Sequence, residues 1–179
     1  MKGKTSKRMI STNSVANCCN PKLISLAVII TFSVITTSCS TNSVFEENAA
    51  VDVKEWHMND VKAFKATFQD SLQPLDFYVE IRNSTSYPNN KLFLFFNTTF
   101  PDGRSARDTL ACVLASPDGR WLGNGLGSVK DNLFLVKRKV LLPRKGTYTF
   151  TLQHAMRDSI VKGIHDVGIK IKSSEISPN

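Results

Sequence analysis

The first 45 residues contain no aspartate or glutamate, and the first acidic residue is Glu46. Five basic residues lie in this stretch, so it contributes most of the formal net charge of +8 and leaves about +3 for the rest of the chain. These residues are Lys2, Lys4, Lys7, Arg8 and Lys22. The remaining basic residues are scattered apart from Lys137-Arg138-Lys139, a run typical of a solvated edge or turn. No nucleic-acid partner is therefore expected.

Long apolar runs are also scarce, and the mean hydropathy of −0.14 excludes a multispanning membrane protein. The first such run, residues 23–34, follows the basic region and precedes the small residues of Ile35-Thr36-Thr37-Ser38. It is too short to span a bilayer comfortably as a permanent helix. This order is typical of a bacterial secretory signal, so residues 1–38 are predicted to be a signal peptide.

Cys39 follows these small residues directly. This arrangement resembles the lipobox of bacterial lipoproteins, in which the cysteine is acylated and becomes the first residue after cleavage. The box is a loose one, with Thr36 three residues before the cysteine and Ile35 one step further back. The resemblance implies that Cys39 carries lipid, including palmitate. The alternative is an uncleaved signal anchor with Cys39 as an ordinary thiol.

Cysteine is otherwise rare, because Cys18 and Cys19 lie in the predicted signal peptide and only Cys112 follows Cys39. If Cys39 is acylated, the mature chain has no intramolecular disulfide. Cys112 lies within Leu110-Ala111-Cys112-Val113-Leu114, and a small apolar thiol in such a strand is expected to pack in a core rather than to act as a nucleophile.

Residues 39–54 are small and polar without periodicity, which predicts a lipidated flexible tether with a reach of roughly 45 Å. Residues 55–173 instead show a period of two between turn signals. In residues 75–82, for example, Leu75, Phe77, Val79 and Ile81 alternate with polar side chains. We predict one all-β domain, an antiparallel β-sandwich of about seven to eight strands, immunoglobulin-like or jelly-roll-like. Residues 174–179 are predicted to be a disordered tail.

Three features of this region predict a strand, two turns and the sites of partner contact. The run Leu92–Phe96 is apolar on both faces, which indicates a central strand covered on both sides, or a strand with one face in the core and the other against a partner. The tetrapeptide Pro-Asp-Gly-Arg occurs at 101–104 and at 117–120 and predicts two chain reversals. The loops 84–90 and 123–131 are the places where partner contacts are first expected.

Residues that could support catalysis are missing. The sequence has three histidines, His57, His154 and His165, and none has a metal-ligand spacing. There is no nucleophile elbow, no phosphate-binding glycine loop and no informative carboxylate pair. We therefore expect no enzyme activity, no catalytic residue, no metal site and no cofactor, and structural roles for the histidines.

Aromatic platforms offer an alternative function, because exposed indoles on sandwich scaffolds stack against sugar rings. Trp56 and Trp121, or Tyr87, would serve a glycan-binding lipoprotein of an outer-membrane nutrient-uptake system. Tryptophan is highly buried on average, so the sequence favours core positions for both indoles.

Several ordered blocks resemble the gliding motility lipoprotein GldH family of Bacteroidota. The central blocks are Phe100-Pro101-Asp102-Gly103, Asp108-Thr109-Leu110 and the segment from Pro117 to Gly125. The flanking blocks are Trp56, Asp60, Val61 and Phe64, then Gly146-Thr147-Tyr148, Gln153-His154-Ala155-Met156-Arg157 and Ile164 to Gly168. The likeness extends from Cys39 to Lys172, and the order of the blocks is more specific than any one of them.

The resemblance implies a non-enzymatic envelope lipoprotein that takes part in gliding motility and in the associated type IX secretion system. Its partners would be the membrane, through the lipid on Cys39, and other envelope proteins. Because no acidic cluster follows Cys39 immediately, and Glu46 and Glu47 come late, we expect the outer membrane with the domain facing the periplasm.

Three tripeptides resemble the Asp-Ser/Thr-apolar acceptor for O-glycosylation in exported Bacteroidota proteins. The hydroxyl residues of these tripeptides, Ser71, Thr109 and Ser159, are the candidate acceptors. A glycan is bulky and requires an exposed acceptor, so Thr109, inside a predicted strand, is the weakest of the three.

Overall fold

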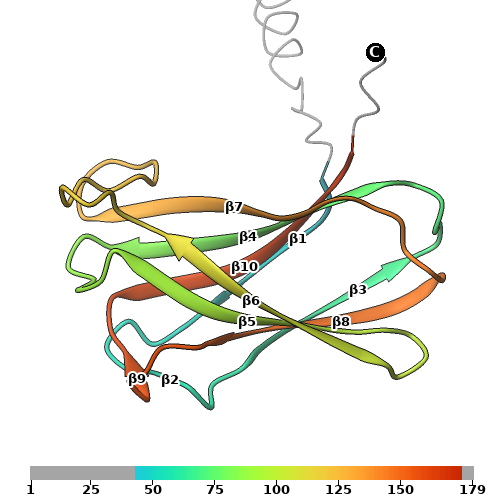
Figure 1. The fold of residues 1–179 in the computed structure, drawn as a ribbon, viewed down its shortest axis with the longest axis horizontal. Coiled ribbons are helices and arrows are strands. Elements are labelled where there is room, and N and C mark those ends of the chain that lie inside the picture. The colour runs from blue at the N-terminus through green and yellow to red at the C-terminus, as the bar shows by residue number, and fades with distance from the viewer. Residues whose placement is uncertain (1–42, 175–179) are drawn as a thin grey trace, which may run out of the picture. The chain divides into compact units, whose positions relative to one another are not determined.

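The structure is a computed structural model that describes residues 43–174 (Figure 1). This range contains ten β-strands and no helix, so none of its residues belongs to a helix that could cross a membrane. The strands are β1 (Ser43–Ala50), β2 (Trp56–His57), β3 (Lys62–Phe68), β4 (Leu75–Ser84), β5 (Lys91–Thr99), β6 (Ser105–Val113), β7 (Val129–Val140), β8 (Gly146–His154), β9 (Ile160–Val161) and β10 (Ile164–Ser173).

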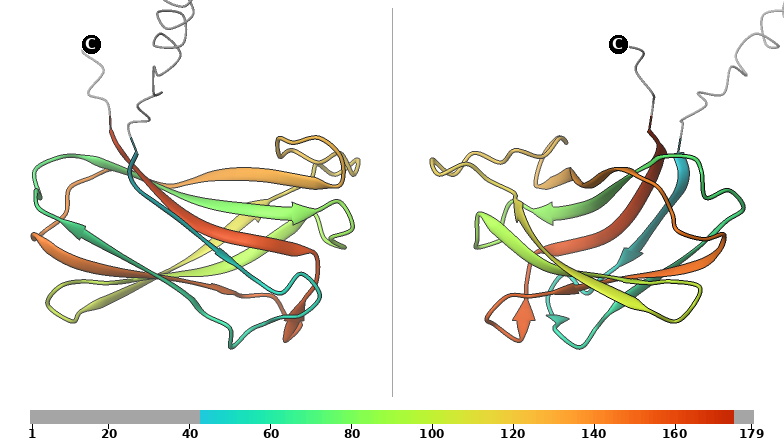
Figure 2. Two further views of the ribbon diagram at one scale, coloured as in Figure 1. Left: turned by 180° about the vertical axis from the view of Figure 1, so that it is seen from behind. Right: turned by 45° about the vertical axis from the view of Figure 1, so that its right-hand side comes forward.

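The long strands form two four-stranded antiparallel sheets that face each other (Figures 1 and 2). The first sheet has the order β1-β10-β4-β7 and the second has the order β3-β8-β5-β6. The two-residue strands β2 and β9 pair separately. The predicted all-β antiparallel sandwich is therefore confirmed, with β1 and the two shortest strands in addition to those that the periodicity indicated.

The core lies between the sheets and follows from the alternation. In β4 the apolar residues Leu75, Phe77, Val79 and Ile81 are each at most 4% exposed, while the residues between them face outward. Phe150 of β8 stacks on Phe96 of β5, and its ring also meets that of Phe77 at a centroid distance of 5.7 Å. Full burial of one such side chain contributes roughly 1.5–3 kcal/mol. The Phe77–Phe150 contact joins the two sheets, whereas the Phe96–Phe150 contact lies within the second sheet.

The apolar run Leu92–Phe96 forms a central strand of the second sheet, between β8 and β6. Leu92, Leu94 and Phe96 enter the core, whereas Phe93 is 39% exposed. Phe95 lies on the outer face, where the Arg107 guanidinium sits 5.0 Å from the ring centroid. One face of the strand therefore lies in the core and cover of both faces within the domain is wrong, whereas a partner on the outer face stays a prediction.

Both Pro-Asp-Gly-Arg segments reverse the chain, as predicted. In the first, the Gly103 amide donates to the Phe100 carbonyl oxygen at 2.9 Å, and in the second the Gly119 amide donates to Ser116 at the same distance. Both glycines have positive φ, 83° and 86°. Glycine is the residue that takes this conformation without a steric cost.

The boundaries of the predicted tether and tail are wrong where the structure describes them. Residues 43–50 form β1, which pairs with β10 from Ser43↔Lys172 to Ala50↔Asp166. No apolar alternation marks this strand, because it lies at the sheet edge and buries only Phe45 and Ala49 in part against the core. Ser174 is buried, and its amide donates to the Pro74 carbonyl at 2.8 Å. The signal peptide, Cys39 and residues 175–179 lie outside the described residues.

The sandwich has two ends, which we name by a residue at each. At the Ser43 end, Ser43, Lys172, Asp76 and Val140 lie across the first sheet. At the Leu126 end, the last residue of β4, Ser84, pairs with Val129. The ten residues of β4 separate the ends by roughly 30 Å. In Figure 1 the loop between β6 and β7 lies at the left and the β3–β4 turn at the right.

Candidate functional site

The two loops singled out in the sequence, 84–90 and 123–131, lie side by side at the Leu126 end. The Thr85 amide donates to the Ser128 carbonyl oxygen at 2.7 Å, and Ser84 pairs with Val129. Sequence separation hid this proximity, because only the pairing of β4 with β7 creates it. The loops therefore form one continuous surface.

Two buried asparagines lie between this surface and the core. Asn132 is 8% exposed and Asn83 is fully buried. The Asn132 side-chain amide donates to Asn83 Oδ1 at 2.8 Å, and the Asn83 amide donates to the Ser84 carbonyl at 2.9 Å. A buried amide costs stability unless it is paired, so this pair fixes the relative position of β4 and β7. Asn83 lies two residues after Ile81, so the alternation of β4 places it on the inward face, and this was the signal in the sequence for a buried asparagine.

Glycines shape the second loop around this pair. A Cβ at Gly123 would lie 2.7 Å from Asn132 Oδ1, which leaves no room for a side chain. Gly125 has φ 125°, and a Cβ there would lie 2.8 Å from the Val129 carbonyl oxygen. The Asn124 backbone N–H donates to the Asp131 carbonyl oxygen at 2.9 Å, and the Asp131 N–H donates to the Asn124 carbonyl oxygen at 2.8 Å. The loop is thus held by backbone hydrogen bonds.

This loop exposes apolar side chains. Leu126 is 100% exposed and Leu122 is 51% exposed. Single exposed leucines are common on protein surfaces, but here a hydrogen-bonded loop presents both of them. Such a side chain gains free energy only when another surface covers it. The loop is therefore suited to contact a partner.

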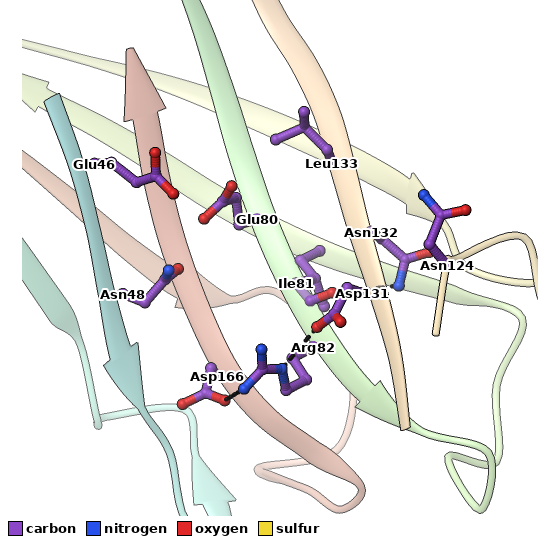
Figure 3. A pocket seen from close by; sticks show the side chains of 10 residues that line it. All are labelled: Glu46, Asn48, Glu80, Ile81, Arg82, Asn124, Asp131, Asn132, Leu133 and Asp166. Atoms are coloured by element: carbon purple, nitrogen blue, oxygen red, sulfur yellow. Dashed lines mark hydrogen bonds and ion pairs between the residues drawn. The ribbon is translucent and has the colours of Figure 1, made fainter. Parts of the chain in front are cut away.

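A charged hollow of about 390 Å³ adjoins the loop on the outer face of the first sheet (Figure 3). Arg82 of β4 lies between Asp131 and Asp166 (Figure 3). The Arg82 Nε donates to Asp131 Oδ1 of β7 at 2.7 Å, and Nη1 lies 3.5 Å from Asp166 Oδ2 of β10. The hydrogen bond to Asp131 raises the pKa of Arg82 above its usual value. Alternation places Arg82 outward, but only the tertiary fold shows its two carboxylate neighbours.

Glu46 and Glu80 line another part of the hollow, and both lie beside Lys170. Lys170 Nζ lies 2.6 Å from Glu46 Oε2 and 3.7 Å from Glu80 Oε1. The hydrogen bond from Lys170 holds the pKa of Glu46 below its usual value. Between these residues and Arg82, the Asn48 side chain crosses β10 at Gly168, where any Cβ would overlap Asn48 Oδ1. Each cation thus bridges adjacent strands.

These charges are suited to the recognition of polar groups on a partner. Among residues 43–174, no three histidine, cysteine or acidic side chains are grouped to hold a metal ion. The Arg82 side chain is half-exposed whereas that of Lys170 is largely buried, so a partner's polar side chains can compete most readily for the carboxylates beside Arg82.

The cysteine of the described chain, Cys112, is 2% exposed. Burial raises the pKa of its thiol to about 12. The thiolate is the nucleophilic form, so this thiol is chemically inert in the folded protein. The core position agrees with the expectation from the sequence.

The structure removes the proposed aromatic platforms at two positions. Trp56 is fully buried, and its Nε1 donates to the Asp60 carbonyl at 2.9 Å. Tyr87 is 4% exposed and donates to the Lys91 carbonyl at 3.0 Å. Trp121 is half-buried against the core. Stacking of a sugar on Trp56 or Tyr87 is excluded because neither ring face reaches solvent.

The three histidines do not come together as a site. His154 is 1% exposed and meets the Trp56 ring edge-to-face at 5.1 Å. Burial holds the pKa of His154 below its usual value. His57 is exposed and His165 is half-buried.

The candidate glycan acceptors lie apart from one another. Ser159 is exposed in the turn before β9, and Thr109 is exposed on β6, at the edge of the second sheet. Ser71 is half-buried in the turn between β3 and β4. The exposure of Thr109 differs from what its place in a strand suggested, since it faces away from the core.

Fold and site together define a β-sandwich that presents a hydrogen-bonded, leucine-bearing loop beside a charged hollow. Residues 43–171 match the family described as GldH lipoprotein, and the match starts where β1 starts. A protein of Christiangramia forsetii named "Gliding motility lipoprotein GldH homolog" is 33% identical over 158 residues, covering 84% of this chain and 96% of the relative. The Flavobacterium johnsoniae protein named "Gliding motility lipoprotein GldH" is 32% identical over 163 residues, covering 87% and 98%. The chain belongs to the GldH lipoprotein family.

Proposed function

We propose that this chain is a lipid-anchored, non-enzymatic component of the gliding-motility machinery, and that it docks on other envelope proteins through the Leu126 loop and the adjacent hollow. Family membership supports the motility and lipoprotein parts of this proposal. The observation that carries the docking part is the fully exposed Leu126 on a loop fixed by buried asparagines and glycines.

The docking proposal is tested by complementation of a deletion strain. We expect Leu126→Asp to reduce surface spreading as strongly as the deletion, because a charge opposes burial of the loop. Leu135→Asp is the control, since Leu135 is 49% exposed within β7 and belongs to neither proposed contact surface. Equal spreading by both variants would contradict docking through Leu126, provided that both proteins accumulate to the same level.

The same strains test the link to secretion. We expect the deletion to lower the export of proteins carried by the type IX system as well as spreading. Normal export in a strain that does not spread would limit the chain's role to motility.

Acylation of Cys39 anchors the domain in this proposal. Radiolabelled palmitate is expected to enter the wild-type chain, and Cys39→Ala is expected to lose the label and to leave the membrane fraction. Retention of both by Cys39→Ala would contradict the anchor. The outer membrane, with the domain in the periplasm, is the proposed location, so an impermeant amine reagent should label the chain only after cell lysis.

Glycans on Ser71, Thr109 and Ser159 remain part of the proposal. The exposed Ser159 and Thr109 are the better placed acceptors, because a glycan cannot be accommodated in a packed position. The intact mass of the mature protein decides, since polypeptide plus lipid alone would exclude the modification.

A further inference from the structure

The Ser43 end lies close to the proposed anchor because β1 starts early. Only four peptide units separate Cys39 from Ser43, and they span at most roughly 14 Å. Ser43 pairs with Lys172, which pairs with Asp76, and Val140 pairs with the neighbouring Leu75. Three strand spacings of roughly 4.8 Å therefore separate Ser43 from the end of β7. If lipid is attached at Cys39, as proposed above, this end of the sheet lies at headgroup level.

The segment that leaves β7 at this end is strongly basic. Residues 137–145 read Lys-Arg-Lys-Val-Leu-Leu-Pro-Arg-Lys, with five basic residues and no acidic one. Lys137 pairs with Asp108 at 2.7 Å, and Arg144 lies 3.8 Å from Asp102. Arg138, Lys139 and Lys145 are exposed, and none of them forms an ion pair with another residue of the described range.

The acidic residues beside this segment are already engaged. Asp76 Oδ1 accepts the Lys139 amide at 2.8 Å, and Asp102 pairs with Arg104 at 2.9 Å. Asp108 is taken by Lys137. Arg138, Lys139 and Lys145 thus form no ion pair with these carboxylates and remain available to anions from outside.

Exposed apolar side chains accompany the charges. Leu141 is 60% exposed between the two basic groups, and Leu72 of the β3–β4 turn is 82% exposed at the same end. Lys139 adopts a positive φ of 52°, and its amide is held by Asp76, so the chain turns at a fixed position. Basic residues that flank exposed leucines are typical of segments that lie on an anionic lipid surface.

We propose that residues 137–145 form a lipid-contacting edge, in which Arg138, Lys139 and Lys145 bind anionic phospholipid headgroups and Leu141 enters the interface. This contact rests on the proposed anchor for its location, and it would orient the Leu126 end away from the bilayer. A single acyl attachment by itself leaves a domain free to tumble.

The experiment compares lysine reactivity at the two ends of one molecule. The full chain is purified from membranes and reconstituted in phosphatidylcholine vesicles with or without about one third phosphatidylglycerol. An amine reagent and mass spectrometry then report Lys139 and Lys145, with the exposed Lys91 and Lys162 of the Leu126 end as internal controls. We expect anionic lipid to lower the reactivity of Lys139 and Lys145 about threefold, and high salt to restore it. Unchanged reactivity of these two lysines would overturn the proposal.

A charge-reversal pair provides the second arm. Arg138→Glu/Lys139→Glu/Lys145→Glu is compared with Lys54→Glu/Lys91→Glu/Lys162→Glu, which changes the net charge equally at exposed positions of the other end. A fluorophore on Leu141→Cys reports quenching by brominated anionic lipid, and we expect only the first triple variant to lose it. Equal quenching in both would also overturn the proposal.

The intact mass of the same preparation reports acylation separately. An unacylated chain would contradict the anchor alone, whereas reactive Lys139 and Lys145 in an acylated chain would contradict the headgroup contact alone.

Discussion

At the Leu126 end, buried polar side chains lie beneath an exposed leucine, whereas at the Ser43 end exposed leucines lie among charged side chains that face the solvent. Asn83, Asn132 and His154 lie inside the first end, and Leu126 lies outside it. Arg138 and Lys139 are exposed at the second end. The buried polar residues at the Leu126 end determine its shape, so changes there are expected to alter folding. The charges at the Ser43 end have little structural role, so changes there are expected to alter what the surface binds.

The largest effect is expected at Trp56. Because its indole is fully buried against His154 and hydrogen-bonded to Asp60, Trp56→Ala should lower the free energy of unfolding by about 3–5 kcal/mol. Leu126→Ala at the same end should change it by no more than about 0.5 kcal/mol. Urea titration followed by circular dichroism measures both. A small loss for Trp56→Ala would show that the indole is not a structural residue.

Asn132→Ala should have the next largest effect. It leaves Asn83 Oδ1 without its donor, at a cost of about 1–3 kcal/mol. The double variant Asn83→Ala/Asn132→Ala should cost less than the sum of the single changes, because neither buried partner is then left unpaired. Additive losses in the same titration would contradict a coupled pair beneath the loop.

His154 should make the Leu126 end sensitive to acid. Burial lowers the pKa of the folded imidazole, so folding favours the neutral form. The stabilisation is complete above the unfolded pKa of about 6.5 and is lost as pH falls through the lower folded pKa. The Tm of the wild type should therefore fall between pH 7.5 and pH 5 more steeply than that of His154→Gln.

The smallest effects are expected at the Ser43 end. Lys139 has φ 52°, so Lys139→Gly should change stability by less than about 1 kcal/mol, whereas the β-branched Lys139→Val should cost about 1–2 kcal/mol. Thermal unfolding of the two variants measures the difference. Equal stability would show that the kink after Arg138 is not held in place.

The sequence predicts the sandwich where apolar and polar side chains alternate, as in Leu75–Ile81. In such a strand the alternation itself shows which face is buried. It does not reveal β1, whose residues Ser43–Ala50 lie at an edge and owe their conformation to hydrogen bonds with β10. Because β1 begins at Ser43, the segment that links Cys39 to the domain is shorter than the predicted tether of residues 39–54. Local sequence cannot supply a strand that depends on its partner.

The candidate site shows the same limit. Alternation puts Arg82 outward and Asn83 inward, and the glycines mark the loop after Trp121. Nothing local places Asp131 and Asp166 on either side of Arg82, since residues 49 and 84 positions away meet only in the folded sheet. That loops 84–90 and 123–131 carry partner contacts stays a prediction, but the pairing of β4 with β7 makes the two loops one surface.

Photo-crosslinking in living cells tests the division between the two ends most directly. A photoreactive amino acid is placed at position 126 in one strain and at position 141 in another. We predict a discrete protein adduct from position 126 and a radiolabelled phospholipid adduct from position 141. Phospholipid attached at position 126, or the same protein adduct from both positions, would contradict the account.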